Sequence, residues 1–238
     1  MSTPPEIPSS ISIIIPAHNE AVTICDAVAD AVRVLRSLGC AYEVLVVDDG
    51  STDSTASRVR DVFVANGSVR LIQTGTNIGA NRAIYLGFSA ARSAAMFFLP
   101  ADLQVRADQL LRCLPALSYA DVICTRRSPR ADSWTRRLLA LIYNGVARRL
   151  FHLPCHDVDS VILVRREVVT KVVPLLLSHS DFLPVEFIVR ARAAGFQIGE
   201  VAIMHYPRTA GSPTAVRPAS VLQTMRDLAL GYFRLRGA

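Results

Sequence analysis

The clearest chemistry in this chain lies where a short apolar run ends on two oxygen-bearing side chains. Residues 97–99 have the character of a buried strand, and Asp102 and Gln104 follow them two residues apart. The end of a buried strand lies at the rim of an α/β sheet, where open sheets of this kind bind ligands. In extended chain, residues two apart point the same way, so we expect both side chains to hold one Mg²⁺ or Mn²⁺. A helix N-cap or a turn is the alternative role for an Asp here.

Two further apolar runs of strand character end in polar clusters. Residues 11–16 are followed by the polar segment 17–20, and residues 42–47 are followed by the acidic segment 48–53. Such β-branched runs are typical of strands that are buried on both faces of a parallel sheet. Together with the end at Asp102, these strand ends can face one crevice. Taken alone, the same polar residues also suit helix capping and turns.

Length and composition limit the class of protein. A chain of 238 residues is long enough for the core of one α/β domain, and a second independent domain is not expected. No window offers the ~18 uninterrupted apolar residues of a membrane span, and the first residues lack the pattern of a signal peptide. Five cysteines without paired spacing suit buried thiols in a reducing compartment. These features predict a cytoplasmic protein.

Positive charge is concentrated in one part of the chain. Residues 121–150 contain seven arginines against two aspartates, a local net charge of +5. Guanidinium groups bind phosphate oxygens in a bidentate manner, so this segment favours phosphate or an anionic membrane surface. The alternative is an ordinary solvated helix face. Nucleic acid is a weaker fit, because no aromatic residues alternate with the arginines to stack on bases.

Strand and helix patterns alternate along the chain, which predicts an α/β domain with a mainly parallel sheet and helices on both faces. Segments 126–132 and 209–218 collect Gly, Ser and Pro and are expected to be flexible. The expected strands are 11–16, 42–48, 69–73, 95–99, 120–125, 158–164 and 197–203, and the expected helices are 20–38, 53–65, 79–93, 107–117, 133–151, 167–178, 184–194 and 218–235.

The order of these motifs resembles that of family 2 glycosyltransferases of the GT-A type. The family pattern runs P-x-x-N-E, V-V-D-D-G-S-x-D, N-x-G-x-x-x-A and D-x-D, and this chain has counterparts at 16–20, 46–53, 77–83 and 100–102. The resemblance implies that the first half holds the nucleotide of a sugar donor. The residues it assigns to the nucleotide are Pro16, Ala17, Asn19, Glu20, Asp48, Asp49, Ser51, Asn77 and Gly79. We expect a diphosphate near the helix that begins at Gly79, since helix N-termini attract anions.

The second half is most similar to polyprenyl-phosphate hexosyltransferases, the group that includes dolichol-phosphate mannose synthases. The matching segments are 125–127, 136–144, 157–162 and 200–212. The resemblance implies a disordered N-terminus (1–10), one GT-A domain (11–212) and a C-terminal amphipathic helix (213–238). Within the domain, 11–105 is the donor half and 106–212 the acceptor half. Three residues depart from the pattern, namely Pro100 at the first acid of D-x-D, Val161 in place of Gly, and Pro213 in place of Lys.

The implied activity is the inverting transfer of a hexose from a nucleoside-diphosphate sugar to a polyprenyl phosphate. Asp102 would act through the metal on the leaving diphosphate, and Asp157 would orient the reacting groups, unless it is a cap or an ion-pair partner. The acceptor phosphate is assigned to Arg126, Arg136, Ser160 and Arg208. One alternative is a family 2 enzyme with a soluble hydroxyl acceptor, for which Asp157 would be the base. Another, suggested by Pro100, is a donor-binding protein without turnover.

The expected helices 133–151 and 218–235 combine apolar residues at helical spacing with arginines. Helices of this kind can lie on an anionic membrane surface, and an enzyme with a lipid-linked acceptor must work there. These features favour peripheral attachment at the cytoplasmic face. The alternative is an amphipathic helix packed on the core, or a dimer contact. The apolar residues concerned are Leu138, Leu139, Leu141, Ile142, Val146 and Leu150 in the first helix, and Leu222, Met225, Leu228, Ala229, Tyr232 and Phe233 in the second.

Overall fold

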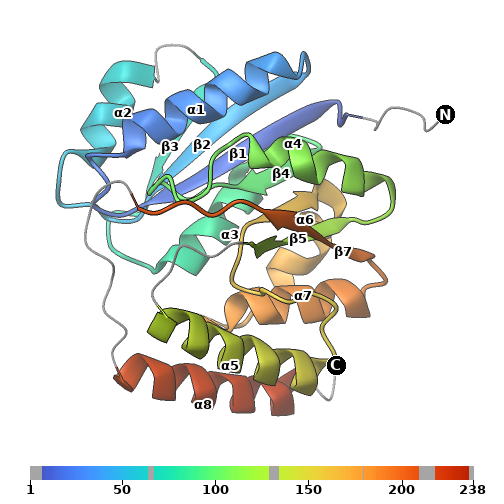
Figure 1. Ribbon diagram of the computed structural model, residues 1–238. Helices are drawn as coiled ribbons and strands as arrows, with labels where there is room; N and C mark the ends of the chain where they lie inside the picture. Colours follow the sequence, from blue (N-terminus) through green and yellow to red (C-terminus); the bar gives the residue numbers. More distant parts are fainter. Residues whose placement is uncertain (1–6, 64–66, 129–133, 179, 209–217, 236–238) are drawn as a thin grey trace.

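One mixed sheet organises the protein. The computed structural model describes residues 7–63, 67–128, 134–178, 180–208 and 218–235. Within these ranges seven strands form a single sheet in the order β3-β2-β1-β4-β6-β5-β7 (Figure 1). Only β6 runs against its neighbours β4 and β5, so the mainly parallel sheet is confirmed. The strands are β1 (Ser10–Ala17), β2 (Ala41–Asp48), β3 (Val69–Gln73), β4 (Ala95–Phe98), β5 (Val122–Arg127), β6 (Ile162–Arg165) and β7 (Ile198–Ile203).

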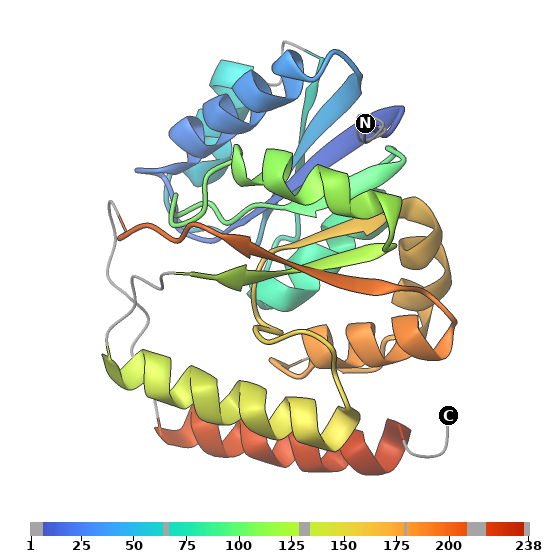
Figure 2. The same ribbon diagram turned by 45° about the vertical axis from the view of Figure 1, so that its right-hand side comes forward.

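Helices cover both faces of this sheet, and two more form an outer layer (Figures 1 and 2). One face carries α1 (Ile24–Ser37), α2 (Thr55–Phe63) and α4 (Gln109–Cys113) with the 3₁₀ helix Leu114–Ser118. The other carries α3 (Ala80–Ala90), α6 (Arg166–Val172) with the 3₁₀ helix Val173–Leu175, and α7 (Leu183–Ala193). The outer layer consists of α5 (Trp134–Phe151) and α8 (Pro218–Leu235), which pair with each other beyond α7.

The central strands form where the sequence is continuously apolar. Ile13, Ile14 and Ile15 are completely buried, as are Val44–Val47 in the neighbouring strand. Helices on both faces exclude water from these strands, which is why they need no polar alternation. The β1–β2 register pairs Ala17 with Asp48, so both strands end at the same level. This common edge gathers the polar segments that follow the strands.

Several element boundaries differ from those that the sequence predicts. The expected helix 107–117 breaks at Pro115, because proline supplies no N–H to continue the α-helical ladder. The helix expected over 167–178 changes to a 3₁₀ turn at Pro174 in the same way. Strand β6 begins only at Ile162, four residues later than expected, because residues 157–160 form a loop held by side chains of other elements. Disorder or flexibility was expected for 1–10, 126–132 and 209–218, and the greater part of these segments lies outside the described residues. Within the described part, Ser10 begins β1, Arg126 and Arg127 belong to β5, and Pro218 begins α8, so the expectation is wrong for these residues.

Candidate active site

An ion pair at the carboxyl edge of the sheet joins the loop after β4 to the segment after β7. Arg208 follows β7, and its Nη2 lies 2.8 Å from Oδ2 of Asp102 in the loop after β4. Both side chains are largely shielded, with 28% and 13% of their surface exposed. The sequence assigned different roles to these two residues, since Asp102 was expected to bind the metal and Arg208 the acceptor phosphate. The structure brings them into direct contact.

The backbone around Asp102 is a turn and not the extended chain assumed from the sequence. Leu103 has φ of +61°, in the left-handed region that non-glycine residues seldom adopt. The Asp102 carboxylate receives the Gln104 N–H through Oδ1 at 3.1 Å, as in a turn closed by an aspartate side chain. The reasoning that Asp102 and Gln104 point the same way in an extended strand is therefore wrong. Their proximity comes instead from this turn.

The segment after β7 lies against the Asp102 loop. The N–H of Tyr206 donates to the Gln104 carbonyl at 2.8 Å, and Nε2 of Gln104 donates to the Tyr206 carbonyl at 3.4 Å. The Arg106 guanidinium lies over the Tyr206 ring, 5.1 Å from its centroid. These contacts hold the segment that carries Arg208 at the sheet edge, beside the loop that follows β4. Nothing in the local sequence around Gln104 indicates this pairing.

Asn19 joins the loops that follow β1 and β2. Its Oδ1 accepts the Thr52 N–H at 2.8 Å, and its own N–H donates to Oγ of Ser51 at 2.9 Å. Asn19 also has a positive φ of 56°, which asparagine tolerates better than most residues. Ser51 and Asn19, both predicted to contact the nucleotide, thus first of all make the two loops one rigid unit. Pro16 and Ala17 end β1 directly beneath it.

The carboxylates of Asp48 and Asp49 are buried, and each of their oxygens accepts a hydrogen bond from the chain. Asp49 accepts the N–H groups of Ile78 and Gly79 at 2.7 and 2.9 Å, in front of α3. Asp48 accepts the Ser51 N–H at 3.2 Å and the Gln73 carboxamide at 3.1 Å. The helix entrance at Asn77 and Gly79, where a diphosphate was expected, therefore already gives two of its N–H groups to Asp49. The turn-and-cap alternative accounts for both carboxylates.

Glu20 lies near the Asp102–Arg208 pair. Partial burial raises its pKa above 4.5, the nearby Asp102 carboxylate acts in the same direction, and Arg208 and the Thr23 hydroxyl oppose it. The Thr23 hydroxyl donates to Oε2 of Glu20 at 3.0 Å. Two carboxylates and one guanidinium are thus close enough to interact electrostatically. They come from the ends of β1 and β4 and from the segment after β7.

The loop that carries Asp157 and Ser160 is held from three sides. Arg127 at the end of β5 binds the Asp157 carboxylate with two N–H···O bonds of 2.8 Å each. The hydroxyls of Thr125 and Ser160 lie 2.7 Å apart, and Oδ1 of Asn144 in α5 accepts the Val158 N–H at 2.9 Å. Asp157 is 4% exposed and Ser160 is 7% exposed. Asp157 is therefore an ion-pair partner, the alternative that the sequence left open.

Sequence reasoning selected Arg126 and overlooked Arg127. Alternation along β5 puts Thr125 and Arg127 on the same face as the Asp157 loop and turns Arg126 to the other face, which is a signal that the sequence contained. Arg126 is about half exposed, with Nε 3.9 Å from Oε2 of Glu200. The side chain of Arg136 lies outside the described residues.

Two properties of the described residues bear on the site. No group of three or more His, Cys, Asp or Glu side chains is placed to hold a metal ion in that part of the chain. Among the helices in the described ranges, none has the length and apolarity needed to span a bilayer.

The seven-stranded sheet, with its order β3-β2-β1-β4-β6-β5-β7 and helices on both faces, has the GT-A fold of glycosyltransferases. The chain belongs to glycosyl transferase family 2, whose family model matches residues 12–173. Solved structures of glucosyl-3-phosphoglycerate synthase from Mycobacterium tuberculosis share this fold. The complex with uridine diphosphate has a TM-score of 0.70 at 17% identity, covering 94% of this chain and 80% of that one. The complex with Mn²⁺, UDP-glucose and phosphoglyceric acid has a TM-score of 0.71 at 16% identity, covering 94% and 79%.

Curated relatives are more similar in sequence. Undecaprenyl-phosphate 4-deoxy-4-formamido-L-arabinose transferase from Sodalis glossinidius is 30% identical over 213 residues, which cover 89% of this chain and 64% of the relative. The protein of that name from Edwardsiella ictaluri is 29% identical over 203 residues, covering 84% and 61%. The chain thus spans somewhat over three fifths of the length of these relatives.

Proposed function

We propose that the protein transfers a sugar from a nucleoside-diphosphate sugar to a polyprenyl phosphate, with inversion at the anomeric carbon. The observation that carries this proposal is the 2.8 Å contact between Arg208 and Asp102. This contact places a cation from the acceptor half beside a carboxylate at the sheet edge of the donor half. The names of the relatives, which act on undecaprenyl phosphate, support the acceptor class. Family membership supports the reaction type.

Asp102 and Gln104 fit a divalent metal in chemistry. A carboxylate oxygen and a carboxamide oxygen are hard ligands of the kind that Mg²⁺ and Mn²⁺ prefer. Arg208 donates to Oδ2 of Asp102 and the Gln104 N–H donates to Oδ1, and each carboxylate oxygen has a second lone pair that can meet a metal. Pro100 removes a second acid from this loop, so the donor phosphates would complete the ligand set. When bound, such a metal neutralises charge on the departing diphosphate.

The chain's own residues have distinct parts in this proposal. Arg208 adds positive charge beside Asp102, where charge develops on the leaving group. Arg126 and Arg136 meet the acceptor phosphate, and a phosphate is already an anion that needs no strong base. Asp157, already paired with Arg127, acts by fixing that guanidinium and the 157–160 loop. The same pairing disfavours the alternative with a soluble hydroxyl acceptor, since that reaction requires Asp157 as a free base.

Product analysis tests the proposal. The full chain is incubated with radiolabelled nucleotide sugars, Mg²⁺ or Mn²⁺, and a short-chain polyprenyl phosphate, and the label is then partitioned between butanol and water. We expect the label to enter the organic phase only when the polyprenyl phosphate is present. A new water-soluble glycoside would overturn the acceptor assignment, and label that remains on the donor with every acceptor would overturn the activity.

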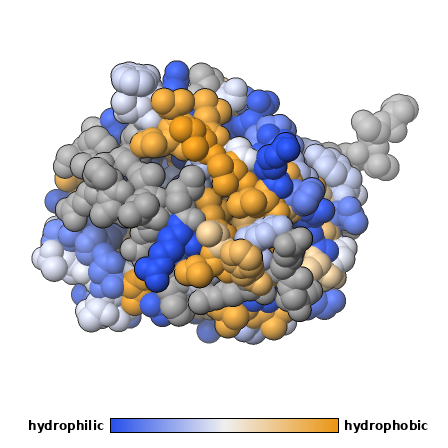
Figure 3. Space-filling model, turned by 90° about the horizontal axis from the view of Figure 1, so that it is seen from below, coloured by the Kyte–Doolittle hydropathy of each residue, from blue (hydrophilic) through white to orange (hydrophobic). Residues whose placement is uncertain are grey.

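We further propose that α5 and α8 rest on the membrane that contains the acceptor. An apolar surface runs over this outer layer when the molecule is seen from below (Figure 3). Its most exposed members are Trp134 at 74%, Leu141 at 70% and Phe233 at 73%. Arg149 and Arg226 are exposed on the same two helices and suit anionic head groups. Of the residues predicted for this surface, Leu228 is 1% exposed and Tyr232 packs on Phe151, so both face inward.

Vesicle flotation tests the membrane proposal. We expect binding to anionic vesicles that weakens as the salt concentration rises, and loss of binding in the variant Leu141→Glu/Phe233→Glu. The matched control is Tyr119→Glu, at a residue that is 62% exposed but belongs to neither helix. Equal loss in the control variant, or equal binding to neutral and anionic vesicles, would contradict the proposal.

A further inference from the structure

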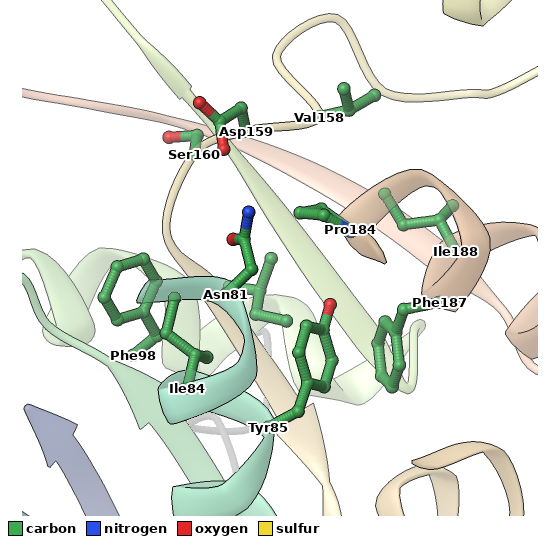
Figure 4. Close-up of a pocket in the computed structure, with 11 residues that line it drawn as sticks. Asn81, Ile84, Tyr85, Phe98, Val158, Asp159, Ser160, Pro184, Phe187 and Ile188 are labelled. Carbon is green, nitrogen blue, oxygen red and sulfur yellow. The ribbon is translucent and has the colours of Figure 1, made fainter. Parts of the chain in front are cut away.

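A narrow pocket lies between α3, the segment 158–162 and the first turns of α7 (Figure 4). Asn81, Tyr85 and Ser160 line it together with apolar side chains. Its free space is about 20 Å³, and a single water needs roughly 10–15 Å³, so the pocket has room for one water at most. This pocket is therefore part of the packed interior and is too small for a ligand.

A far larger hollow opens beside the last turns of α5. Its volume is about 620 Å³, within the range of about 300–1,000 Å³ that is usual for ligand pockets. Spacings of three and four residues put most of its lining on one face of the helix. Two guanidinium groups and an imidazole line it, and none of the described residues that line it is acidic. The lining residues are Gly145, Arg148, Arg149, His152 and Leu153.

The guanidinium of Arg148 is incompletely satisfied by the protein. Its Nε is shielded from solvent and has no hydrogen-bond acceptor among the described residues, and the side chain as a whole is half-buried. A shielded polar group normally has a hydrogen-bond partner, and a shielded charge without one is more costly still. An anion in the hollow would offset that cost.

Arginines in the last turn of a helix commonly serve the negative end of that helix. In α5 other groups meet the terminal carbonyls. The Leu153 N–H donates to the Arg148 carbonyl at 3.2 Å. Nη1 of Arg192 in α7 donates to the carbonyls of Phe151, at 3.3 Å, and of His152. The guanidinium groups that line the hollow are therefore not needed to cap the helix, and they remain available to a ligand.

The exposed apolar surface of α5 leads to this hollow. Leu138, Leu141 and Ile142 are exposed, and Leu141 precedes Gly145 by four residues. Residues four apart lie on the same face of a helix, so the apolar surface and the hollow follow one another along that face. A molecule with an anionic head and an apolar chain fits this succession, and membrane lipids have that form.

We propose that the hollow binds the phosphomonoester head group of a membrane lipid. Guanidinium groups bind phosphate oxygens in a bidentate manner, and a phosphomonoester offers three terminal oxygens where a phosphodiester offers two. The two arginine charges match the charge of about −1.5 to −2 that a phosphomonoester carries near pH 7. The inference rests on the proposed contact of α5 and α8 with the membrane and adds a head-group preference. Arg136, assigned to the acceptor phosphate, lies about 20 Å from Arg149 along α5, so the hollow is a separate site.

Vesicle flotation at matched surface charge tests the head-group preference. Phosphatidylcholine vesicles carry either phosphatidic acid, a phosphomonoester, or phosphatidylglycerol, a phosphodiester, in amounts that give the same zeta potential. We expect wild type to bind the phosphatidic acid vesicles about tenfold more tightly, as for one additional hydrogen bond between charged groups. Arg148→Gln and Gly145→Glu should bind both kinds of vesicle equally.

Gly145→Glu is useful because it preserves the helix. The added carbon meets no atom within 4 Å, and glutamate is a better helix former than glycine. The new carboxylate lies one turn from Arg149 and occupies the hollow in place of the anion. Arg226→Gln, at an exposed residue of α8, is the matched control. It removes one positive charge outside the hollow and should weaken binding to both kinds of vesicle by the same factor.

The outcomes separate this site from the broader membrane proposal. Equal binding of wild type to both kinds of vesicle would refute the head-group site and leave the membrane proposal standing, whereas failure to bind either kind would refute both. A preference that survives in Arg148→Gln and in Gly145→Glu would refute this location. Displacement by glycerol phosphate at the concentration at which lipid phosphate binds would show a site for free phosphate and refute the lipid assignment. Sugar transfer plays no part in these measurements, so product analysis tests it independently.

Discussion

Replacing Asp157 by Asn tests whether this carboxylate supports the acceptor loop or acts as a base. The change keeps the shape of the side chain and removes the charge that meets the Arg127 fork. Breaking a fully buried ion pair by removing one partner costs about 3–5 kcal/mol. The Arg127 side chain is 17% exposed and can reach some water, and the amide keeps one acceptor oxygen. We therefore expect a loss of about 2–3 kcal/mol in unfolding free energy.

Thermal and urea unfolding followed by circular dichroism measure this loss. For a chain of this size each kcal/mol lowers Tm by roughly 2–4 °C, so Tm should fall by about 4–12 °C. Asp61→Asn, at an exposed residue of α2, controls for a change of the same chemistry and should leave Tm within about 1 °C. A double-mutant cycle with Arg127→Met should show that the two changes are not additive.

A distinct result would refute the reasoning. If Asp157→Asn unfolds with wild-type stability but loses turnover, the carboxylate is a base and the acceptor is a hydroxyl. In that case kcat/KM of the wild type should also rise with pH along a limb that the variant lacks. Reduced stability together with a raised acceptor KM is the result that the ion pair predicts.

Three further predictions concern other parts of the molecule. Arg208→Ala removes the cation that shares the Asp102 carboxylate, so the variant should bind Mn²⁺ about fivefold more tightly, as expected for a partly exposed pair worth about 1 kcal/mol. Electron paramagnetic resonance with Mn²⁺ as the added ligand measures this affinity. Unchanged or weaker binding would contradict competition between the two cations. Burial alone would raise the pKa of Glu43, but hydrogen bonds from the Arg92 N–H, Ser12 and Arg70 outweigh it and hold the pKa below 4.5. Its contribution to stability is therefore complete above pH 4.5 and lost as the pH falls through the lower folded value, so Glu43→Gln should weaken the protein near neutral pH and flatten its acid unfolding in urea titrations. Gly231→Ala places a methyl group inside the Phe182 ring and should lower the unfolding free energy by about 1–3 kcal/mol, measured by thermal unfolding. Gly145→Ala is the control, because its added carbon meets no atom within 4 Å, and it should not destabilise α5. Equal effects would show that α8 does not pack as described.

Local pattern determined most of the architecture. The apolar runs at 11–16, 42–47 and 95–99 are long and β-branched or aromatic enough to form buried strands wherever they are placed, and they lie side by side in the sheet. Because parallel strands end at one edge, the same pattern also indicated that the polar segments behind them would meet. The glycine at 79 and the asparagine at 19 occupy positive-φ positions that their residue types tolerate.

The partners of the charged side chains depended on the tertiary structure. Asp102 and Arg208 are 106 residues apart, and Asp157 and Arg127 are 30 apart, so no local spacing relates them. The left-handed turn at Leu103, which replaced the expected extended chain, is stabilised by contacts from the distant segment at Tyr206. Likewise the period of α8 defined an apolar stripe, but the tertiary structure decided that Gly231 packs on Phe182 and that Leu228 is buried while Phe233 stays exposed. Periodicity reports which residues share a face, whereas the neighbour of that face is decided by the free energy of packing the whole chain.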